Sequence, residues 1–304
     1  MVRFVLALVI AVPLGLDLYI PVPEDNPLTR ERIEVGRRLF HDRRLSRDHS
    51  LACSSCHDPE RAFSTARPLS RGVFGRQGRR NVPALINRGY GKAFFWDGRI
   101  TTLEEQVLKP IQDPNEMDMT LADASTRVGL SAKEISHALA SYVRSILSGN
   151  ARFDRFVNGD RRALSPEQQR GLTIFRSKGN CIACHVGPNF TDERLHNTGV
   201  AWRPFGGARP GGRYLDDGHF AVSGRAEDRG RFKTPTLRDV DRTSPYMHDG
   251  SKTTLQDVVN FYDDGGRPNP NLDIEIRPLD LTVEEKRALV SFLRSLSGRV
   301  REGT

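Results

Sequence analysis

Cys53-Ser54-Ser55-Cys56-His57 and its counterpart Cys181-Ile182-Ala183-Cys184-His185 are the most informative stretches of this 304-residue chain. In a C-x-x-C-H motif the two thiols attach covalently to a haem, and the adjacent histidine ligates its iron. A zinc knuckle and a thioredoxin-like redox pair are the alternatives. A zinc site would not require a histidine directly after each second cysteine, and the two motifs use all four cysteines of the chain. The sequence therefore predicts two covalently bound c-type haems.

Length and charge limit the organisation of the chain and its partners. A chain of this length forms one large domain or two medium ones, and one motif in each half favours two domains with one haem each. The 46 Lys and Arg residues exceed the 38 Asp and Glu residues, which gives a net charge of +8. The basic residues are interspersed with acidic ones and no nucleic-acid-binding motif is present, so we expect a solvated basic surface and no nucleic acid partner. Such a surface would also attract an acidic electron-donor protein.

The N-terminus resembles an export signal. Arg3 precedes an apolar run over residues 4–16, which is short for a membrane span. No clear cleavage site follows, so residues 1–24 are either a cleaved signal peptide or an anchor in which the apolar segment extends to Ile20. Haem is attached to C-x-x-C-H motifs outside the cytoplasm. We therefore expect a periplasmic protein, soluble or tethered to the inner membrane.

The two halves have matching sequences. GRRLF at 36–40 precedes the first motif and GLTIF at 171–175 precedes the second, while WDGRITTL at 96–103 matches HDGSKTTL at 248–255. We therefore predict two similar haem domains, at 25–163 and 164–304. The second carries an additional Gly/Arg-rich stretch around residues 202–231, for which we expect a surface loop.

Capping residues predict where helices begin. A Ser or Thr followed three residues later by Glu or Gln is a capping box, and proline favours the first helical position. Long alternating apolar and polar runs are absent, which argues against a sheet core. We expect a mostly helical chain, with helices beginning after Thr29, Ser131, Ser165 and Thr282.

The copies differ where haem chemistry is decided, at the sixth coordination position of the iron. The helix that follows each Asp-Gly pair is expected to end at Pro110 in the first half and at Tyr262 in the second. Tyr262 is either an iron ligand or a core tyrosine. Pro110 cannot ligate iron, and no histidine lies between His57 and His137. The first haem is therefore expected to be open to a small molecule.

An open haem that cleaves an O–O bond needs a group that moves a proton. Glu116 and Gln106 are candidates, although most glutamates on helices are simply solvated. The second half has Val258 where the first has Gln106. Trp96, beside Phe94 and Phe95, is either a core residue or an electron relay between the haems.

With these motifs in order, the chain resembles the bacterial di-haem cytochrome c peroxidase and MauG family. The resemblance rests on RNVP at 80–83, FWDGR at 95–99, FKTPTLRDV at 232–240 and SPYMHDG at 244–250. These segments surround both haem motifs in the order found in that family. The similarity covers residues 26–298, nearly the whole expected mature chain.

The resemblance implies an all-α fold of two cytochrome-c-like domains related by internal duplication. His57 would hold the peroxide-reactive haem and His185 the electron-transfer haem, with Trp96 between them. Glu116 would be the acid–base residue and Gln106 its neighbour. A calcium ion between the domains would be bound by Asn81, Thr243 and Pro245.

The sequence departs from standard peroxidases of that family in two ways. These close the first haem with a histidine in the loop after the motif, but residues 58–80 contain none. They also ligate the second haem with a methionine, where this chain has Tyr262, as MauG-like members do. Met247 is a competing ligand, but it aligns with Phe95, a packing position. A phenolate ligand favours ferric iron and a lower reduction potential.

We therefore expect a peroxidase that reduces hydrogen peroxide to water with electrons from a small c-type cytochrome or cupredoxin, without reductive activation. The first alternative is a MauG-like oxidase that modifies a partner protein through a high-valent iron state. The second is a di-haem electron carrier, against which the asymmetry of the copies argues. Substituting Glu116 would separate an enzyme from a carrier. The oligomeric state, monomer or homodimer, stays open.

Overall fold

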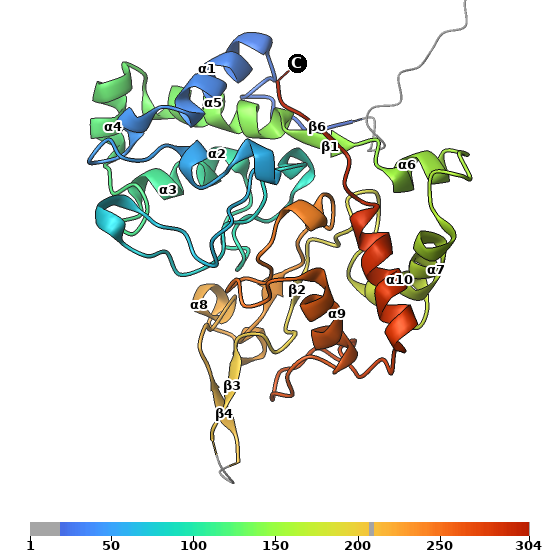
Figure 1. The fold of residues 1–304 in the computed structure, drawn as a ribbon. Coiled ribbons are helices and arrows are strands. Elements are labelled where there is room, and N and C mark those ends of the chain that lie inside the picture. Colours follow the sequence, from blue (N-terminus) through green and yellow to red (C-terminus); the bar gives the residue numbers. More distant parts are fainter. Residues whose placement is uncertain (1–18, 207–209, 304) are drawn as a thin grey trace, which may run out of the picture.

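Four helices form where the capping residues predict them. The computed structural model describes residues 19–206 and 210–303, which are mainly helical (Figure 1). Each of the four cap hydroxyl groups accepts a hydrogen bond from a backbone N–H in the first turn of its helix. Thr29 caps α1 (Arg30–Phe40), Ser131 caps α5 (Ala132–Ser145), Ser165 caps α7 (Pro166–Arg176) and Thr282 caps α10 (Val283–Arg294).

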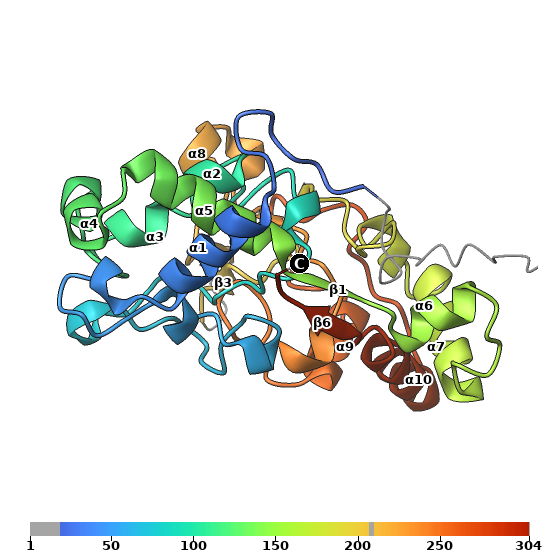
Figure 2. The ribbon, with the colours of Figure 1, turned by 90° about the horizontal axis from the view of Figure 1, so that it is seen from above.

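These helices form two closely crossed pairs, α1 with α5 and α7 with α10 (Figures 1 and 2). A Cβ atom on Gly36 would lie 1.9 Å from the carbonyl oxygen of Ala138, and one on Gly171 would lie 2.0 Å from that of Ala288. No side chain fits at either crossing. The matching GRRLF and GLTIF segments thus place a glycine where two helix backbones meet.

Each pair has its own hydrophobic core. In the first half Phe40 packs on Tyr142 with ring centroids 5.0 Å apart. In the second half Phe175 packs on Phe292 at 5.2 Å. The remaining helices are α2 (Leu103–Gln106), α3 (Lys109–Gln112), α4 (Leu121–Val128), α6 (Arg152–Val157), α8 (Phe220–Ser223) and α9 (Leu255–Asp263).

The helix expected to end at Pro110 is instead divided into α2 and α3. Pro110 is the second residue of α3, so the predicted end at this position is wrong. Proline has no N–H to donate to the carbonyl four residues before it, which favours a break in the helix. In the second half the corresponding helix, α9, is continuous and includes Tyr262.

Strands contribute only short antiparallel pairs to the described part of the chain, and no sheet core forms there. The pairs are β1 (Leu147–Gly149) with β6 (Arg299–Arg301), β2 (Leu195–His196) with β5 (Phe232–Lys233), and β3 (Trp202–Pro204) with β4 (Gly212–Tyr214). In the first pair Leu147 lies opposite Arg301, so the end of the chain returns to the first half (Figure 2). Tyr142 donates a hydrogen bond to Glu302 there.

The Gly/Arg-rich stretch at 202–231 is more ordered than the expected surface loop. It contains the β3–β4 hairpin, which projects from the body, and then α8 (Figure 1). Trp202 is buried and packs edge-on against Tyr214 with ring centroids 4.8 Å apart. An aromatic pair thus holds the base of the hairpin, which sequence periodicity did not indicate.

Residues 1–18, which carry most of the predicted export signal, lie outside the described residues. Within the described part, no helix is long and apolar enough to cross a membrane. The predicted division between residues 163 and 164 falls in the segment that joins α6 to α7, and it stays a prediction.

Candidate active site

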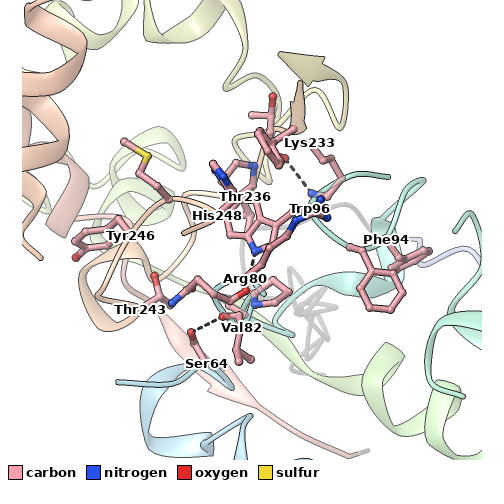
Figure 3. Close-up of a pocket in the computed structure, with 18 of the residues that line it drawn as sticks. Ser64, Arg80, Val82, Phe94, Trp96, Lys233, Thr236, Thr243, Tyr246 and His248 are labelled. Atoms are coloured by element: carbon pink, nitrogen blue, oxygen red, sulfur yellow. Dashed lines mark hydrogen bonds between the residues drawn. The ribbon is translucent and has the colours of Figure 1, made fainter. Parts of the chain in front are cut away.

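One cavity of about 840 Å³ is lined by both C-x-x-C-H motifs and by residues from both halves. Figure 3 shows part of its wall, including Trp96, Thr243 and His248. All of the predicted site residues line this cavity. They are Cys53, Cys56, His57, Asn81, Trp96, Gln106, Glu116, Cys181, Cys184, His185, Thr243, Pro245 and Tyr262.

The two motifs adopt the same local backbone structure. Each begins a short 3-10 turn, in which the N–H of the histidine donates to the carbonyl of the first cysteine. The N···O distance is 2.9 Å for His57 to Cys53 and 2.9 Å for His185 to Cys181. The sequence pattern therefore fixes the same arrangement of two thiols and one imidazole in both halves.

The histidine rings are oriented by backbone carbonyls. The Nδ1–H of His57 donates to Phe63 at 3.0 Å, and that of His185 donates to Phe190 at 2.9 Å. Burial lowers the pKa of both histidines to about 4, so both rings are neutral near pH 7. With Nδ1 occupied, Nε2 is the atom that can ligate a metal.

The residues of each motif fit a covalently attached haem. All four cysteines are unpaired, and burial raises the pKa of Cys53 and Cys181 to about 12, so these thiols are protonated and uncharged. Each motif places two thiols and a neutral imidazole on the wall of a cavity large enough for an organic cofactor. Cys53, Cys56 and His57 would hold one haem, and Cys181, Cys184 and His185 the other.

Glu116 is the titratable carboxyl group that stands out in the first half. Its pKa is raised to about 7, mainly by burial and also by the charge of Asp113, while Arg99 acts in the opposite direction. Its carbonyl accepts a hydrogen bond from the N–H of Val73 at 2.8 Å. A Cβ atom on Gly72 would lie 1.9 Å from the Asn115 carbonyl oxygen, so this segment packs tightly beside Glu116.

In the part of the chain that the structure describes, the first half lines the cavity with residues close to Glu116 in sequence and with a single histidine. Gln106 and Pro110 lie near Glu116 in sequence and line the cavity with it. The described residues of the wall include four histidines, of which His57 alone comes from the first half. The structure therefore places no second histidine from that half in the cavity.

Trp96 connects the two halves. Its indole Nε1–H donates to the carbonyl of Asn81 at 2.8 Å, and its own carbonyl accepts from the N–H of Lys233 at 2.7 Å. Its counterpart His248 is also buried and stacks on Phe232, with ring centroids 3.7 Å apart. Figure 3 shows Trp96, Lys233 and His248 close together on the cavity wall.

The second half presents a phenol to the cavity. Tyr262 lies on α9 with Val258 and Val259, and all three line the cavity. Burial raises the pKa of Tyr262, so the hydroxyl is protonated in the absence of a metal. Met247 also lines the cavity, with a φ of 71° that matches the 62° of Phe95.

The three residues expected to bind calcium line the same cavity. Asn81 is buried, and its Nδ2 donates to the carbonyls of Arg67 at 3.1 Å and Pro68 at 3.0 Å. This leaves the side-chain oxygen available as a ligand. Thr243 and Pro245 contribute to the wall from the segment before Met247.

Several charged residues of the site were not predicted from the sequence. Arg80 pairs with Asp97 at 2.6 Å and with Asp216 at 2.7 Å. Lys233, buried in the cavity wall, faces Glu193 with an Nζ···Oε1 distance of 3.4 Å. Arg80 and Asp216 lie far apart in sequence, so no local pattern indicates their pairing.

A further cluster lies beside the second motif. His196 is hydrogen-bonded to Asp192 at 2.9 Å and to Asp273 at 2.7 Å. Cys184, Asp192 and His196 lie close enough to hold a metal ion. Because the Cys184 thiol belongs to the C-x-x-C-H motif, we assign no separate metal to this cluster.

Comparisons with known proteins agree with this geometry. The family model for di-haem cytochrome c peroxidase matches residues 30–132. The methylamine utilization protein MauG of Methylorubrum extorquens is 36% identical over 91% of this chain and 81% of its own length. The cytochrome-c peroxidase IdrP1 of Pseudomonas sp. is 35% identical over 91% of this chain and 84% of its own. The crystal structure of a MauG-like protein associated with microbial copper homeostasis superimposes with a TM-score of 0.83 and 34% identity, covering 93% of this chain and 94% of that one.

Proposed function

The chain belongs to the di-haem cytochrome c peroxidase family, and we propose that it reduces hydrogen peroxide to water with electrons from a small c-type cytochrome or cupredoxin. The observation that carries this proposal is Glu116, a carboxyl group with a pKa near 7 in the wall of a cavity that both haem motifs line. When bound, the haems supply iron that changes oxidation state, and the one held by His57 supplies the site where peroxide is reduced.

In this proposal Glu116 moves a proton between the two oxygen atoms of peroxide. The carboxylate accepts the proton of one oxygen and returns it to the other, which leaves as water. Two electrons and two further protons complete the conversion of one peroxide to two waters. A pKa near 7 suits both transfers, because the group gains and loses a proton readily at neutral pH. Gln106 offers an amide that hydrogen-bonds the substrate.

We assign electron transfer between the haems to Trp96. Its two backbone-directed hydrogen bonds hold it between the halves, which supports this role. Tyr262 would supply a phenol oxygen as a ligand to the iron of the second haem, and its place on α9 in the cavity wall supports this role. Asn81, with the carbonyls of Thr243 and Pro245, is assigned to calcium, whose preferred ligands are oxygen atoms.

Two wider features belong to the same proposal. The glycine crossings and the paired histidine carbonyl contacts support an internal duplication of one cytochrome-c-like unit. Export to the periplasm is supported by the C-x-x-C-H motifs, since haem attachment to them occurs outside the cytoplasm.

The test is stopped-flow absorbance after stoichiometric peroxide is added to the ferric protein without reductant. We expect a rapid spectral change whose rate is proportional to peroxide concentration, because no histidine of the first half closes the site. A spectrum that changes only after pre-reduction would contradict the open site. A protein that never consumes peroxide in either state would contradict the enzyme itself.

Tyr262 favours a second candidate, a MauG-like oxidase that oxidises side chains of a partner protein. The 36% identity to MauG supports it as well. Stoichiometry separates the two. A peroxidase consumes two equivalents of reduced cytochrome c for each peroxide, whereas the oxidase leaves the cytochrome reduced and consumes peroxide only when its protein substrate is present.

A further inference from the structure

The β3–β4 hairpin is a cationic element without acidic residues of its own. Between residues 199 and 215 the sequence contains three arginines and no aspartate or glutamate. Two of them, Arg203 and Arg213, lie directly opposite each other across the strand pair, and both are exposed. Like charges in this arrangement destabilise strand pairing. An anionic group of a binding partner would reduce this repulsion and so stabilise the hairpin.

No acidic side chain of the described residues neutralises this pair. The next carboxylates along the chain are already engaged, since Asp216 pairs with Arg80 at 2.7 Å and Asp217 with Arg229 at 3.2 Å. Within residues 19–206 and 210–303, neither Arg203 nor Arg213 forms an ion pair or a side-chain hydrogen bond. Their positive charge is therefore available to a partner.

The opposite face of the hairpin is fixed to the body. Trp202 is buried, and its carbonyl accepts a hydrogen bond from Arg267 at 3.0 Å. The hydroxyl of Tyr214 donates to Asn269 at 2.7 Å. Because these contacts use the Trp202 and Tyr214 face, the arginines point to the other side. The hairpin therefore presents the two charges on an anchored support that projects from the body (Figure 1).

The base of the hairpin adjoins the second haem site. Thr198 and Val200, which immediately precede β3, line the cavity together with His185 and Tyr262. Leu215, which follows β4, is 55% exposed and adds an apolar contact beside the arginines. A protein bound to this face would rest next to the haem that we assign to electron transfer.

From these observations we propose that the outer face of the β3–β4 hairpin, formed by Arg203, Arg213 and Leu215, is the docking surface for an acidic electron-donor protein. This inference rests on the proposed function and identifies the partner's chemistry, a redox protein with carboxylates around a small apolar contact. An anionic membrane surface would also attract arginines. The redox protein is favoured because Thr198 and Val200, in the segment that leads into β3, line the cavity beside the second haem motif.

The test measures binding of an acidic cupredoxin to the immobilised ferric holoprotein at several salt concentrations. The comparison probe is the same cupredoxin with its surface carboxylates amidated. We expect R203E/R213E to lose at least tenfold in affinity for the acidic probe and to show a weaker salt dependence. The matched control is R152E/R155E on α6, which makes the same change in net charge on two exposed arginines at a distant site.

Three results would overturn the proposal. The first is that R203E/R213E and R152E/R155E lose affinity equally, and the second is that the native and amidated cupredoxins bind equally well. The third is that R203E/R213E still binds the cupredoxin but no longer binds vesicles of phosphatidylglycerol, which would assign the surface to a membrane. R203Q/R213Q is a second hairpin variant that removes the cross-strand repulsion, and we expect it to melt at a higher temperature than the wild type while binding the acidic probe weakly. A lower melting temperature, or binding as strong as that of the wild type, would count against the argument.

Failure of the proposed function would be visible separately. Wild-type and R152E/R155E protein should both consume peroxide with hydroquinone, a small neutral reductant that needs no docking surface. If they do not, the peroxidase assignment is wrong, although the binding result still stands as evidence for an acidic partner. If they do and the hairpin variants bind normally, the docking proposal alone is wrong.

Discussion

The two halves share one way of holding a haem and differ in what faces it. His57 and His185 have the same turn, the same ring hydrogen bond and the same lowered pKa. The cavity walls differ at two positions that correspond between the halves, since the first half has an amide and a proline where the second has a valine and a phenol. The corresponding residues are Gln106 with Val258 and Pro110 with Tyr262, and the first half also contributes the carboxyl group of Glu116. The comparison teaches that the backbone geometry of the C-x-x-C-H motif is repeated in both halves, whereas the side chains to which we assign the reaction are not.

The difference has an energetic side. Raising the pKa of Glu116 from 4.5 to about 7 means that its surroundings, mainly through burial, disfavour its charged form by about 3 kcal/mol. Val258 and Val259 carry no such penalty. A buried carboxyl group that costs free energy and lines a cavity is characteristic of a group kept for proton transfer.

The largest expected effect comes from removing the proton-transferring group of the first half. E116Q should lower kcat/KM for hydrogen peroxide by about 10²–10⁴, because the amide cannot accept and return a proton. Steady-state turnover with a small reductant measures this. The matched control is E105Q, since Glu105 is exposed and pairs with Lys109 at 3.1 Å. An E116Q enzyme within threefold of wild type would place the acid–base function elsewhere.

The second prediction concerns a substitution of Tyr262, the residue that we assign as an iron ligand in the second half. Y262M should raise the reduction potential of one haem by a few hundred mV, within the roughly 0.8 V range that axial ligands span, because a thioether favours ferrous iron more than a phenolate does. Spectroelectrochemical titration measures both potentials. Y246F is the control, since Tyr246 also lines the cavity. A shift produced by M247L instead would assign the ligand to Met247.

The pH dependence of the reaction should report the pKa of Glu116. Its pKa lies near 7, and as a general base it acts in the deprotonated form, so kcat/KM should rise with pH. For a single group, the deprotonated fraction increases about tenfold between pH 6 and pH 8. The rate of peroxide reaction with ferric protein, recorded across this interval, measures the effect. A profile that keeps its shape in E116Q would show that another group titrates.

The smallest expected effect comes from a substitution that gives the first half the valine found at the corresponding position of the second half. Q106V should lower the rate of peroxide reaction about fivefold, since one hydrogen bond contributes about 1 kcal/mol. The reciprocal change V258Q should leave that rate unaltered and so serves as the control. Equal effects of the two substitutions would mean that the halves are not specialised as proposed.

Local signals predicted much of the fold. Thr29, Ser131, Ser165 and Thr282 begin helices because a cap needs only its own first turn, which the sequence displays directly. The break before Pro110 was also readable, since proline lacks the donor that a continuous helix requires. The alignment of the two halves obscured it, because α9 is continuous at the same place.

Contacts between distant residues were not predictable from one sequence. Tyr214 reaches Asn269 and Arg80 reaches Asp216 only after the whole chain has folded. The β3–β4 hairpin was therefore expected to be a loop, since its contacts with the body, such as that of Tyr214 with Asn269, involve residues outside its own sequence. The haem motifs and the family resemblance pointed to residues that all line one cavity, while the roles assigned to them stay predictions.

The pairing of β6 with β1 affects the order in which the protein matures. Synthesis proceeds from the N-terminus, so residues 147–149 emerge long before their partners at 299–301. The first half cannot complete this strand pair, or the contact between Tyr142 and Glu302, until the last residues have been made and delivered. Both cysteine pairs thus precede the final closing step of the fold. An affinity tag added at the carboxyl end of the chain would follow a few residues after β6, so we expect it to interfere with this last step of folding.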